Sequence, residues 1–352
     1  MLEQASILIF IVIALALIFD FVNGFHDTAN AIATCVSTRA VSPAVAIIMS
    51  AILNFAGAMI STGVAKTIGG DIVQSASMVN EVIIIAALAG AIIWNLITWW
   101  FGMPSSSSHA LVGGIIGAVI ISVGFMGLNG YGILKIFLSL VLSPLAAMAI
   151  GWIILHIIFA ICHSMRPATV NDNCNRLQVI SAALMAFAHG SNDAQKSMGI
   201  ITLALLSGGY IGALEVPTFV KISCAFAMAL GTSFGGWKII RTVGGKIFRM
   251  QPVHGFSADL NSAVVIFGAT LLHLPVSTTH VVSGSIMGVG AAQRVKAVHW
   301  DVARQMLVAW LMTIPCTAIL SAIVYLILHL FFGYFVKIMF SSCNIYLSKN
   351  NL

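Results

Sequence analysis

The sequence predicts an all-helical, polytopic membrane protein made of two related halves with opposite orientation. Its composition, its apolar runs and its internal repeats predict this fold class. Of the 352 residues, 60% are hydrophobic and 7% are charged, and the mean hydropathy is +1.05. Soluble domains carry about 25% charged residues, so this composition excludes a soluble enzyme or a soluble binding module.

Seven apolar runs are long enough to cross a hydrocarbon core of ~30 Å as helices. They lie near residues 5–23, 43–65, 79–101, 133–161, 216–240, 257–274 and 303–330. Shorter apolar pieces could be half-helices, re-entrant segments or further spans, and they lie at residues 110–126, 179–188, 197–206, 281–292 and 331–340. The first run lacks the basic leader and cleavage site of a removable signal, so we expect it to be retained.

Charge and cysteine usage limit the partners of the chain. The net charge of +6 comes from the loops, where it indicates topology rather than a nucleic-acid partner. The six cysteines show no CxxC or Cys/His ligand spacing, and we interpret them as buried thiols. We expect no permanently bound cofactor.

Three motifs recur in the same order along the chain, at offsets of 166, 175 and 171 residues. The matched pairs are residues 23–30 and 189–196, 66–72 and 241–247, and 104–109 and 275–280. An ordered recurrence predicts a duplication. The corresponding domains are a first repeat at 1–161, a cytoplasmic linker at 162–178 and a second repeat at 179–352.

Loop charge predicts that the two repeats are inverted. The loop at residues 66–81 carries one basic and two acidic residues, whereas the equivalent loop at 238–249 carries four basic and no acidic residues. By the positive-inside tendency, the later loop is cytoplasmic and the earlier one is external. Residues 257–292 then form a hairpin or a pair of spans. Inverted repeats usually place their binding site at the bilayer midplane, where the copies meet.

Each copy of the acidic motif places an aspartate, Asp27 or Asp193, after a glycine inside an apolar helix. A carboxylate at this depth is costly unless it faces a wet cavity or a cation, so the pair predicts a binding site. The surrounding small and amide residues are typical of a broken helix. Its free carbonyls, with Asn30 and Asn192, would offer oxygen ligands to Na⁺ or a divalent cation, or the acids would carry protons. The alternative is that each aspartate only caps a half-helix.

Each copy of the proline-led motif contains a cluster of hydroxyl residues that opens an apolar, glycine-containing helix. The clusters are Ser105, Ser106, Ser107 and Ser108, and Ser277, Thr278 and Thr279. Free amides, hydroxyls and the positive end of the helix dipole make such a helix start suitable for a tetrahedral oxyanion. The alternative is that these residues cap helices and bond to one another. His109 and His280 follow the clusters as either packing residues or proton relays.

Other polar and small residues carry weaker signals. Gly113 and Gly117, matched by Gly284 and Gly288, indicate close helix packing behind the hydroxyl clusters. Asp20 and Asp259 lie near the ends of the predicted spans, where we expect water or snorkelling to accommodate them.

The motifs GFHDTANAIAT, HGSNDAQKSMG and PVSTTH together resemble the inorganic phosphate transporter (Pit) family, whose paired signature is close to GxNDxAN. The resemblance covers both halves, from about residue 19 to 293. It implies symport of phosphate with a cation across the inner, or plasma, membrane of a bacterium. The implied phosphate-binding residues are Ser106, Ser107, Ser108, Ser277, Thr278 and Thr279. Lys196 is a further candidate, which we expect to pair with Asp193 or with the phosphate. The implied coupling residues are His26, Asp27, Asn30, Asn192 and Asp193.

Two residues depart from the family signature. His26 stands where the first copy would have Asn, and Lys196 stands in the second copy where Asn would match Asn30. A lysine ammonium cannot ligate Na⁺ and adds a positive charge. The variant resembles the bacterial branch, in which H⁺ is the coupling ion and phosphate travels as a neutral metal complex. Mg²⁺ or another divalent metal would then accompany the phosphate, with Asp27 and Asp193 as its candidate ligands.

Several alternatives remain open at this point. The coupling ion is H⁺ or Na⁺, the anion is phosphate or another oxyanion such as sulfate, and a passive anion channel would also use hydroxyls and helix ends. An intramembrane hydrolase is excluded, because Ser108 and His109 are adjacent on one helix turn and no nucleophile motif accompanies them. Expected partners are phosphate, the coupling cation and membrane lipid, and related folds suggest a homodimer.

Overall fold

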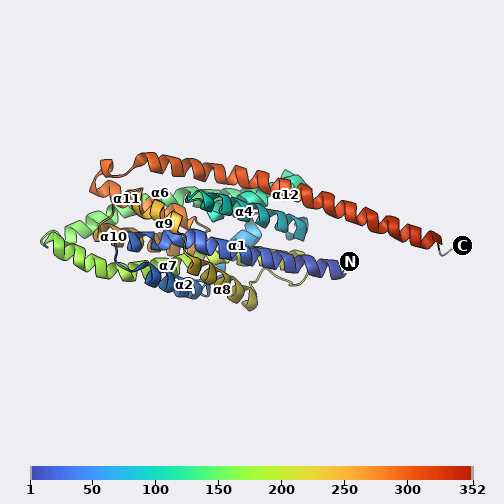
Figure 1. Ribbon diagram of the computed structural model, residues 1–352, viewed down its shortest axis with the longest axis horizontal. Coiled ribbons are helices and arrows are strands. Elements are labelled where there is room, and N and C mark those ends of the chain that lie inside the picture. The colour runs from blue at the N-terminus through green and yellow to red at the C-terminus, as the bar shows by residue number, and fades with distance from the viewer. Residues whose placement is uncertain (1, 350–352) are drawn as a thin grey trace.

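The chain folds as a bundle of helices that run mostly along one long axis (Figure 1). The computed structural model describes residues 2–349, with the side chains of residues 7–331 except that of Trp237. All regular elements in this part of the chain are helical, which confirms the predicted all-helical class. The α-helices are α1 (Leu2–Ser37), α2 (Pro43–Ala58), α3 (Gly63–Asp71), α4 (Glu81–Trp100), α5 (Ser107–Val123), α6 (Gly130–Ile161), α7 (Pro167–Ser207), α8 (Thr218–Phe234), α9 (Trp237–Gly245), α10 (Pro252–Leu271), α11 (Thr278–Gln293) and α12 (Trp300–Lys349). Short 3₁₀ turns are η1 (Ala76–Met78), η2 (Phe125–Gly127) and η3 (Val295–Ala297).

Length and apolar composition make four described helices able to cross a membrane, namely α1, α4, α6 and α12. Two bent pairs pass the same test when each is taken together: α2 with α3, at an angle of 69°, and α8 with α9, at 79°. These elements cover the seven predicted apolar runs, apart from the run at 257–274, which forms most of α10. The chain is therefore a multi-pass membrane protein.

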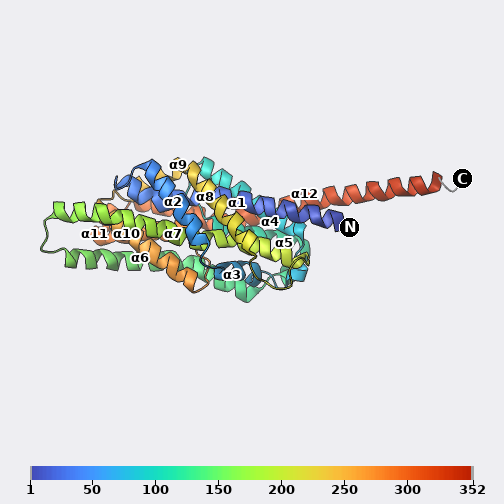
Figure 2. The same cartoon turned by 90° about the horizontal axis from the view of Figure 1, so that it is seen from below.

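The proline-led motifs form the tips of two helical hairpins, α4–α5 and α10–α11. Each tip holds a proline, Pro104 or Pro275, a few residues before the second helix starts. The two hairpins come from opposite ends of the molecule (Figure 2), and the tips touch, because Ser108 Oγ donates to the carbonyl oxygen of Val276 at 3.0 Å. The hairpin predicted for residues 257–292 is thus present.

Helices α1 and α7 are continuous through Asp27 and Asp193, so the breaks predicted at these acids were wrong. The glycines before them serve close packing instead. A Cβ on Gly24 would lie 2.4 Å from the carbonyl oxygen of Met228, and one on Gly190 would lie 2.1 Å from that of Asn54. Close contact with α8 and α2 explains these glycines without any interruption of the helix. Most of the predicted linker at 162–178 is likewise helical, as the start of α7. The domain boundaries stay a prediction.

In each half, the second helix of the hairpin packs against a helix of the other half. Helix α5 packs on α12, and α11 packs on α6. At Gly117 a Cβ would lie 2.1 Å from the carbonyl oxygen of Ala318, and at Gly288 it would lie 2.0 Å from that of Met148. The small-residue faces predicted behind the hydroxyl clusters therefore lie directly on neighbouring backbones. Helices α1 and α7 run in opposite directions in Figure 1, while the inverted orientation of the repeats in the membrane stays a prediction.

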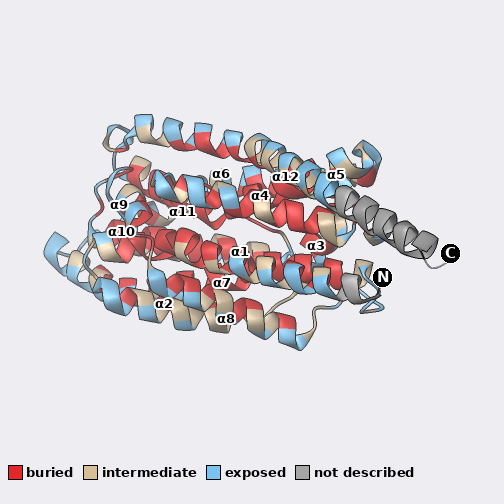
Figure 3. Cartoon of the chain, turned by 45° about the vertical axis from the view of Figure 1, so that its right-hand side comes forward, coloured by how far each residue is buried: buried red, intermediate tan, exposed pale blue. Residues whose placement is uncertain are grey.

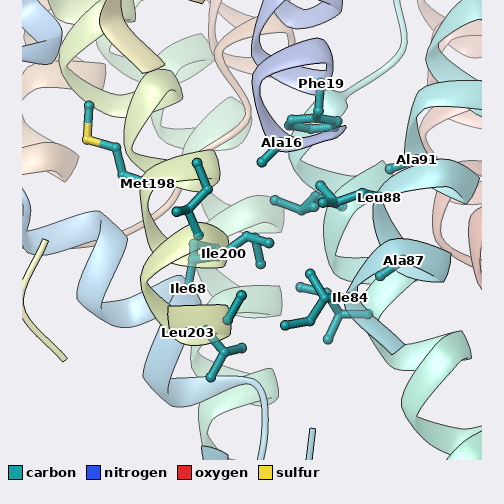
Figure 4. Close-up of a cluster of buried hydrophobic side chains, with 14 of the residues drawn as sticks. Ala16, Phe19, Ile68, Ile84, Ala87, Leu88, Ala91, Met198, Ile200 and Leu203 are labelled. Carbon is teal, nitrogen blue, oxygen red and sulfur yellow. The ribbon is translucent and has the colours of Figure 1, made fainter. Parts of the chain in front are cut away.

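Buried residues are concentrated on α1, α4 and α7, inside the bundle, and exposed residues lie on its outside (Figure 3). Many of the exposed residues are large and apolar. One apolar cluster joins Phe19 of α1, Leu88 of α4 and Ile200 of α7 (Figure 4). A bundle that is apolar on its exterior while polar groups collect inside is the arrangement that a lipid solvent imposes.

The inverted orientation can be tested with two reporter cysteines. In a chain whose six native cysteines are replaced by alanine, we expect Ser77→Cys to react with a membrane-impermeant thiol reagent on intact cells. We expect Gly245→Cys to react only after lysis, because its basic loop is predicted to be cytoplasmic. Both positions are exposed in the structure. Labelling of both from the same side would contradict the inverted orientation.

Candidate functional site

The segments predicted as the site come together in the middle of the bundle. The middle turns of α1 and α7 meet the tips of the two hairpins, and all twelve predicted site residues are buried. The start of α11 lies between the two acids, because Thr279 donates to Asp27 at 3.0 Å and Thr278 donates to Asp193 at 3.2 Å. Consecutive residues of one helix thus connect the acids of the two repeats.

Asp27 accepts hydrogen bonds from both hairpin tips. Ser107 Oγ lies 2.5 Å from its Oδ2, while Oδ1 lies 3.0 Å from Thr279 Oγ1 and 2.8 Å from His26 Nδ1. Asn30 donates to Thr279 Oγ1 at 2.8 Å and so orients the hydroxyl that faces the acid. The first half of the site is therefore a carboxyl group surrounded by hydroxyl, imidazole and amide groups.

Asp193 is held by a fixed positive charge. Lys196 Nζ lies 2.6 Å from its Oδ1, and both side chains are 0% exposed. The other carboxylate oxygen lies 3.2 Å from Thr278 Oγ1 and 3.5 Å from Asn23 Nδ2. A buried lysine needs such a partner, because an unpaired buried ammonium is strongly destabilising. The partner of Lys196 in this structure is thus Asp193.

The two halves of the site are therefore chemically different. Asn30 and Lys196 occupy matching positions, but Asn30 donates to a hydroxyl while Lys196 binds the acid directly. Ser108, which matches Thr279, donates to the carbonyl oxygen of Val276. Only the second half contains a lysine ammonium.

The serines at the hairpin tips have two kinds of contact. Ser106 and Ser277 are N-caps, because their hydroxyls accept hydrogen bonds from the backbone N–H groups of His109 at 3.2 Å and His280 at 3.3 Å. The capping interpretation holds for these two residues. Ser107, one residue later, contacts the acid in the site. The first-turn amides of α5 and α11 have no acceptor within their own helices, so the opposed tips offer donors and two positive dipole ends to an anion.

Asn192 positions the α10–α11 tip. Its amide nitrogen donates to Thr270 Oγ1 at 3.0 Å and to the carbonyl oxygen of Leu274 at 3.2 Å, and its Oδ1 accepts from the backbone N–H of Val276 at 3.3 Å. Gln195, on the same helix, accepts from the first-turn N–H of Val64 at 2.8 Å. These amides attach α7 to its neighbours. As a coupling-ion ligand, Asn192 stays a prediction.

Several polar contacts around the site had no signal in the repeated motifs. Asn54 of α2 donates to Thr28 at 3.1 Å and to Thr232 at 3.0 Å, and it contacts His189 Nδ1 at 3.0 Å. Thr98 of α4 contacts His26 Nε2 at 3.2 Å. A single buried amide or hydroxyl in an apolar helix is the only signal that the sequence gives for such a residue.

The histidines behind the hydroxyl clusters pack against each other. The ring centroids of His109 and His280 are 4.5 Å apart, and His280 stacks on Trp310 at 3.8 Å. Both histidines line a cavity of about 570 Å³ between α6 and α12. Their contacts are those of packing residues, and the proton-relay alternative is untested.

No group of three or more His, Cys, Asp or Glu side chains in the described part of the chain could hold a metal ion. Asp27 and Asp193 each supply one carboxyl group. A divalent cation at either acid would need further oxygens from hydroxyls or from the transported anion.

A multi-pass bundle with two buried acids between opposed hairpin tips is the architecture of a membrane transport protein. A profile of the phosphate transporter family matches residues 23–321. The chain belongs to this phosphate transporter family, which confirms the resemblance and makes it a transporter and not an enzyme.

The comparison with individual proteins agrees with the family. A probable low-affinity inorganic phosphate transporter of Bacillus subtilis (strain 168) is 55% identical over 93% of this chain and 98% of its own length. A protein with the same description from Rhizobium meliloti (strain 1021) is 46% identical over 89% of this chain and 94% of its own. A solved structure described as the sodium-dependent phosphate transporter has a TM-score of 0.86 and 26% identity, covering 92% of this chain and 99% of that one.

The bridging hydroxyl of Thr279 provides a test of the site. We expect Thr279→Val to lower the rate of phosphate uptake by at least about tenfold, because it removes a donor to Asp27 and leaves Asn30 without its acceptor. Thr202→Val is the matched control, since the buried Thr202 hydroxyl bonds only within its own helix, to Met198. Uptake of labelled phosphate by cells producing equal amounts of each variant is the measurement. Equal uptake by both variants would contradict the placement of the site.

Proposed function

We propose that the chain imports inorganic phosphate by symport with protons. Its membership of the phosphate transporter family and the description of its bacterial relatives support phosphate as the substrate. The contact between Lys196 and Asp193 is the observation that supports protons as the coupling ion.

Charge balance explains why an anion would need a coupling cation here. A phosphate anion between the hairpin tips would lie beside two carboxyl groups, and like charges at this depth repel strongly. Lys196 supplies the positive charge that balances Asp193 in this structure. Asp27 has hydroxyl and imidazole neighbours and no lysine partner, so a cation or a proton has to enter the protein together with the anion. This requirement makes the transport a symport.

The second half of the site is poorly suited to sodium. An ammonium group has three donors and no acceptor, so it cannot replace the oxygen ligand that an asparagine would supply. Lys196 also takes up one oxygen of Asp193 at 2.6 Å. A proton needs no coordination shell, so proton coupling tolerates this substitution. Lys196 can also release Asp193 and bind phosphate instead. The hydroxyl groups that donate to the acids can make the same change of partner.

A sodium-coupled alternative is favoured by a different observation. The Oδ1 atom of Asn30 is buried and has no hydrogen-bond donor in the described part of the chain, which suits an oxygen ligand for Na⁺. Asp27 and Thr279 lie beside it. The related structure is described as sodium-dependent. In this alternative one Na⁺ binds at the first half of the site.

The two couplings are distinguished in proteoliposomes that contain the purified protein. We expect an inward proton gradient to drive accumulation of labelled phosphate and a sodium gradient alone to drive none. Parallel samples with and without Mg²⁺ test whether phosphate travels as a metal complex, and excess sulfate tests the anion. Accumulation with sodium alone would overturn the proposed coupling to protons. Downhill flux of phosphate without accumulation would indicate a channel. The mass of the purified particle tests the predicted homodimer.

Replacing the lysine by the residue of the first repeat tests its role. We expect Lys196→Asn to reduce proton-driven uptake by about tenfold or more and to make uptake respond to sodium, because both halves then carry an amide oxygen. Lys221→Asn is the control, since Lys221 lies on α8 and donates to the carbonyl oxygen of Met59. Uptake in opposed sodium and proton gradients is the measurement. An unchanged Lys196→Asn variant would contradict the proposal.

A further inference from the structure

Asp20 is a buried acid that the duplicated motifs do not include. It was expected near the end of a span, within reach of water, but α1 extends from Leu2 to Ser37 and Asp20 is 0% exposed. That expectation was wrong because the first span is longer than its apolar run. Asp20 lies seven residues before Asp27, about 10 Å along α1 toward the end predicted to be external.

The carboxyl group of Asp20 is only half satisfied. Oδ1 accepts a hydrogen bond from Ser197 Oγ at 2.7 Å, whereas Oδ2 has no nitrogen or oxygen partner in the described part of the chain. The thiol of Cys224 on α8 faces the group, and a thiol is a weak donor. An ionised carboxylate in this place would leave a charged oxygen buried and unpaired, which is costly, whereas a protonated one would not.

Asp259 is a second buried acid, and its hydrogen bonds can be compared with those of Asp20. It also lies outside the duplicated motifs and is 2% exposed. Its Oδ1 accepts from Thr34, and its Oδ2 accepts from Gln178 Nε2 at 3.2 Å. Both oxygens are therefore satisfied, in contrast to those of Asp20.

Asp20 lies on the same face of α1 as the transport site. Residues 20, 23 and 27 follow the spacing of one helix face. Between the two acids, Asn23 points its Nδ2 at Asp193 at 3.5 Å, and its Oδ1 has no donor among the residues that the structure describes. Ser197, which holds Asp20, is the neighbour in sequence of Lys196. Two unpaired oxygens thus lie in line between the predicted external end and the ion pair.

We infer that Asp20 is the residue that binds the coupling proton. This inference rests on the proposed proton symport and names the group that carries the charge. Lys196 and Asp193 on α7 and Cys224 on α8 are the titratable groups that face Asp20 from packed helices in the described residues. Lys196 is the cation among them, so it supplies the charge that compensates Asp20 after the proton leaves.

On the outer side a hydronium ion gives its proton to the carboxylate of Asp20 and becomes water. The carboxyl group is then neutral, and Lys196 stays paired with Asp193. On the inner side the O–H bond breaks, the proton passes to water, and the electron pair stays on the Asp20 carboxylate. Lys196 then interacts with two carboxylates and is no longer available to phosphate, which favours release of the anion.

The experiment separates proton coupling from phosphate movement. In proteoliposomes we expect Asp20→Asn to reduce accumulation driven by a proton gradient by about tenfold or more, while exchange of internal for external labelled phosphate at equal pH stays within about twofold of the parent. Exchange needs no net proton movement. Asp259→Asn is the matched control, a second unduplicated buried acid, and it should retain both activities.

Each other outcome identifies which statement is wrong. Proton-driven accumulation by Asp20→Asn would overturn the inference, and so would loss of exchange in a variant with an unchanged unfolding temperature. A parent protein driven by sodium alone would instead overturn the proposed function, and loss of that sodium response in Asp20→Asn would assign Na⁺ to this residue. If Asp20→Asn fails to fold, Ser197→Ala replaces it. Its pH profile of driven uptake should move to higher pH, because the lost hydroxyl stabilised the charged form, and an unmoved profile would overturn the inference.

Discussion

The ion pair between Lys196 and Asp193 is the interaction on which the chemistry of this protein depends. Both side chains are completely buried, and their atoms lie 2.6 Å apart. Neither charge is stable there alone, so each side chain needs the other as its partner. The matching acid, Asp27, has no lysine beside it. One substitution in a duplicated motif therefore makes the two halves chemically different, because only Asp193 has a lysine partner.

The arrangement of the helices brings hydrogen-bond donors to these acids. Helices α1 and α7 are continuous, and their glycines allow α8 and α2 to approach closely. The irregular backbone is found at the two hairpin tips, where it is enclosed by protein. Non-helical backbone at membrane depth is tolerated only in such places. The tips then supply hydroxyls and helix N-termini to the site, so the polar groups that an anion needs are also those that the fold must bury.

The sequence predicted the fold class, the hairpin at 257–292 and the convergence of both motifs, because hydropathy and an internal repeat report these features directly. It did not predict that α1 and α7 stay continuous. A glycine beside an acid has the same sequence signature in a broken helix as in a close helix crossing, and only the neighbour at Met228 or Asn54 distinguishes them. For the same reason, the sequence could not show that Asn192 holds a hairpin tip while Asn30 donates to the hydroxyl of Thr279. Side-chain direction depends on which helices pack together.

Asp20 could not be identified by comparing the two copies of the repeat. Comparison of the two copies identifies what they share, and Asp20 has no acidic counterpart in the second copy. Residues that differ between the copies are the ones that can give the two halves different ion preferences. Lys196 and Asp20 are two such differences, and Ser197 connects them, since it follows Lys196 in α7 and donates to Asp20 at 2.7 Å. The departures from the repeat are therefore where the choice of the coupling ion should be sought, and the shared residues are where the anion should bind.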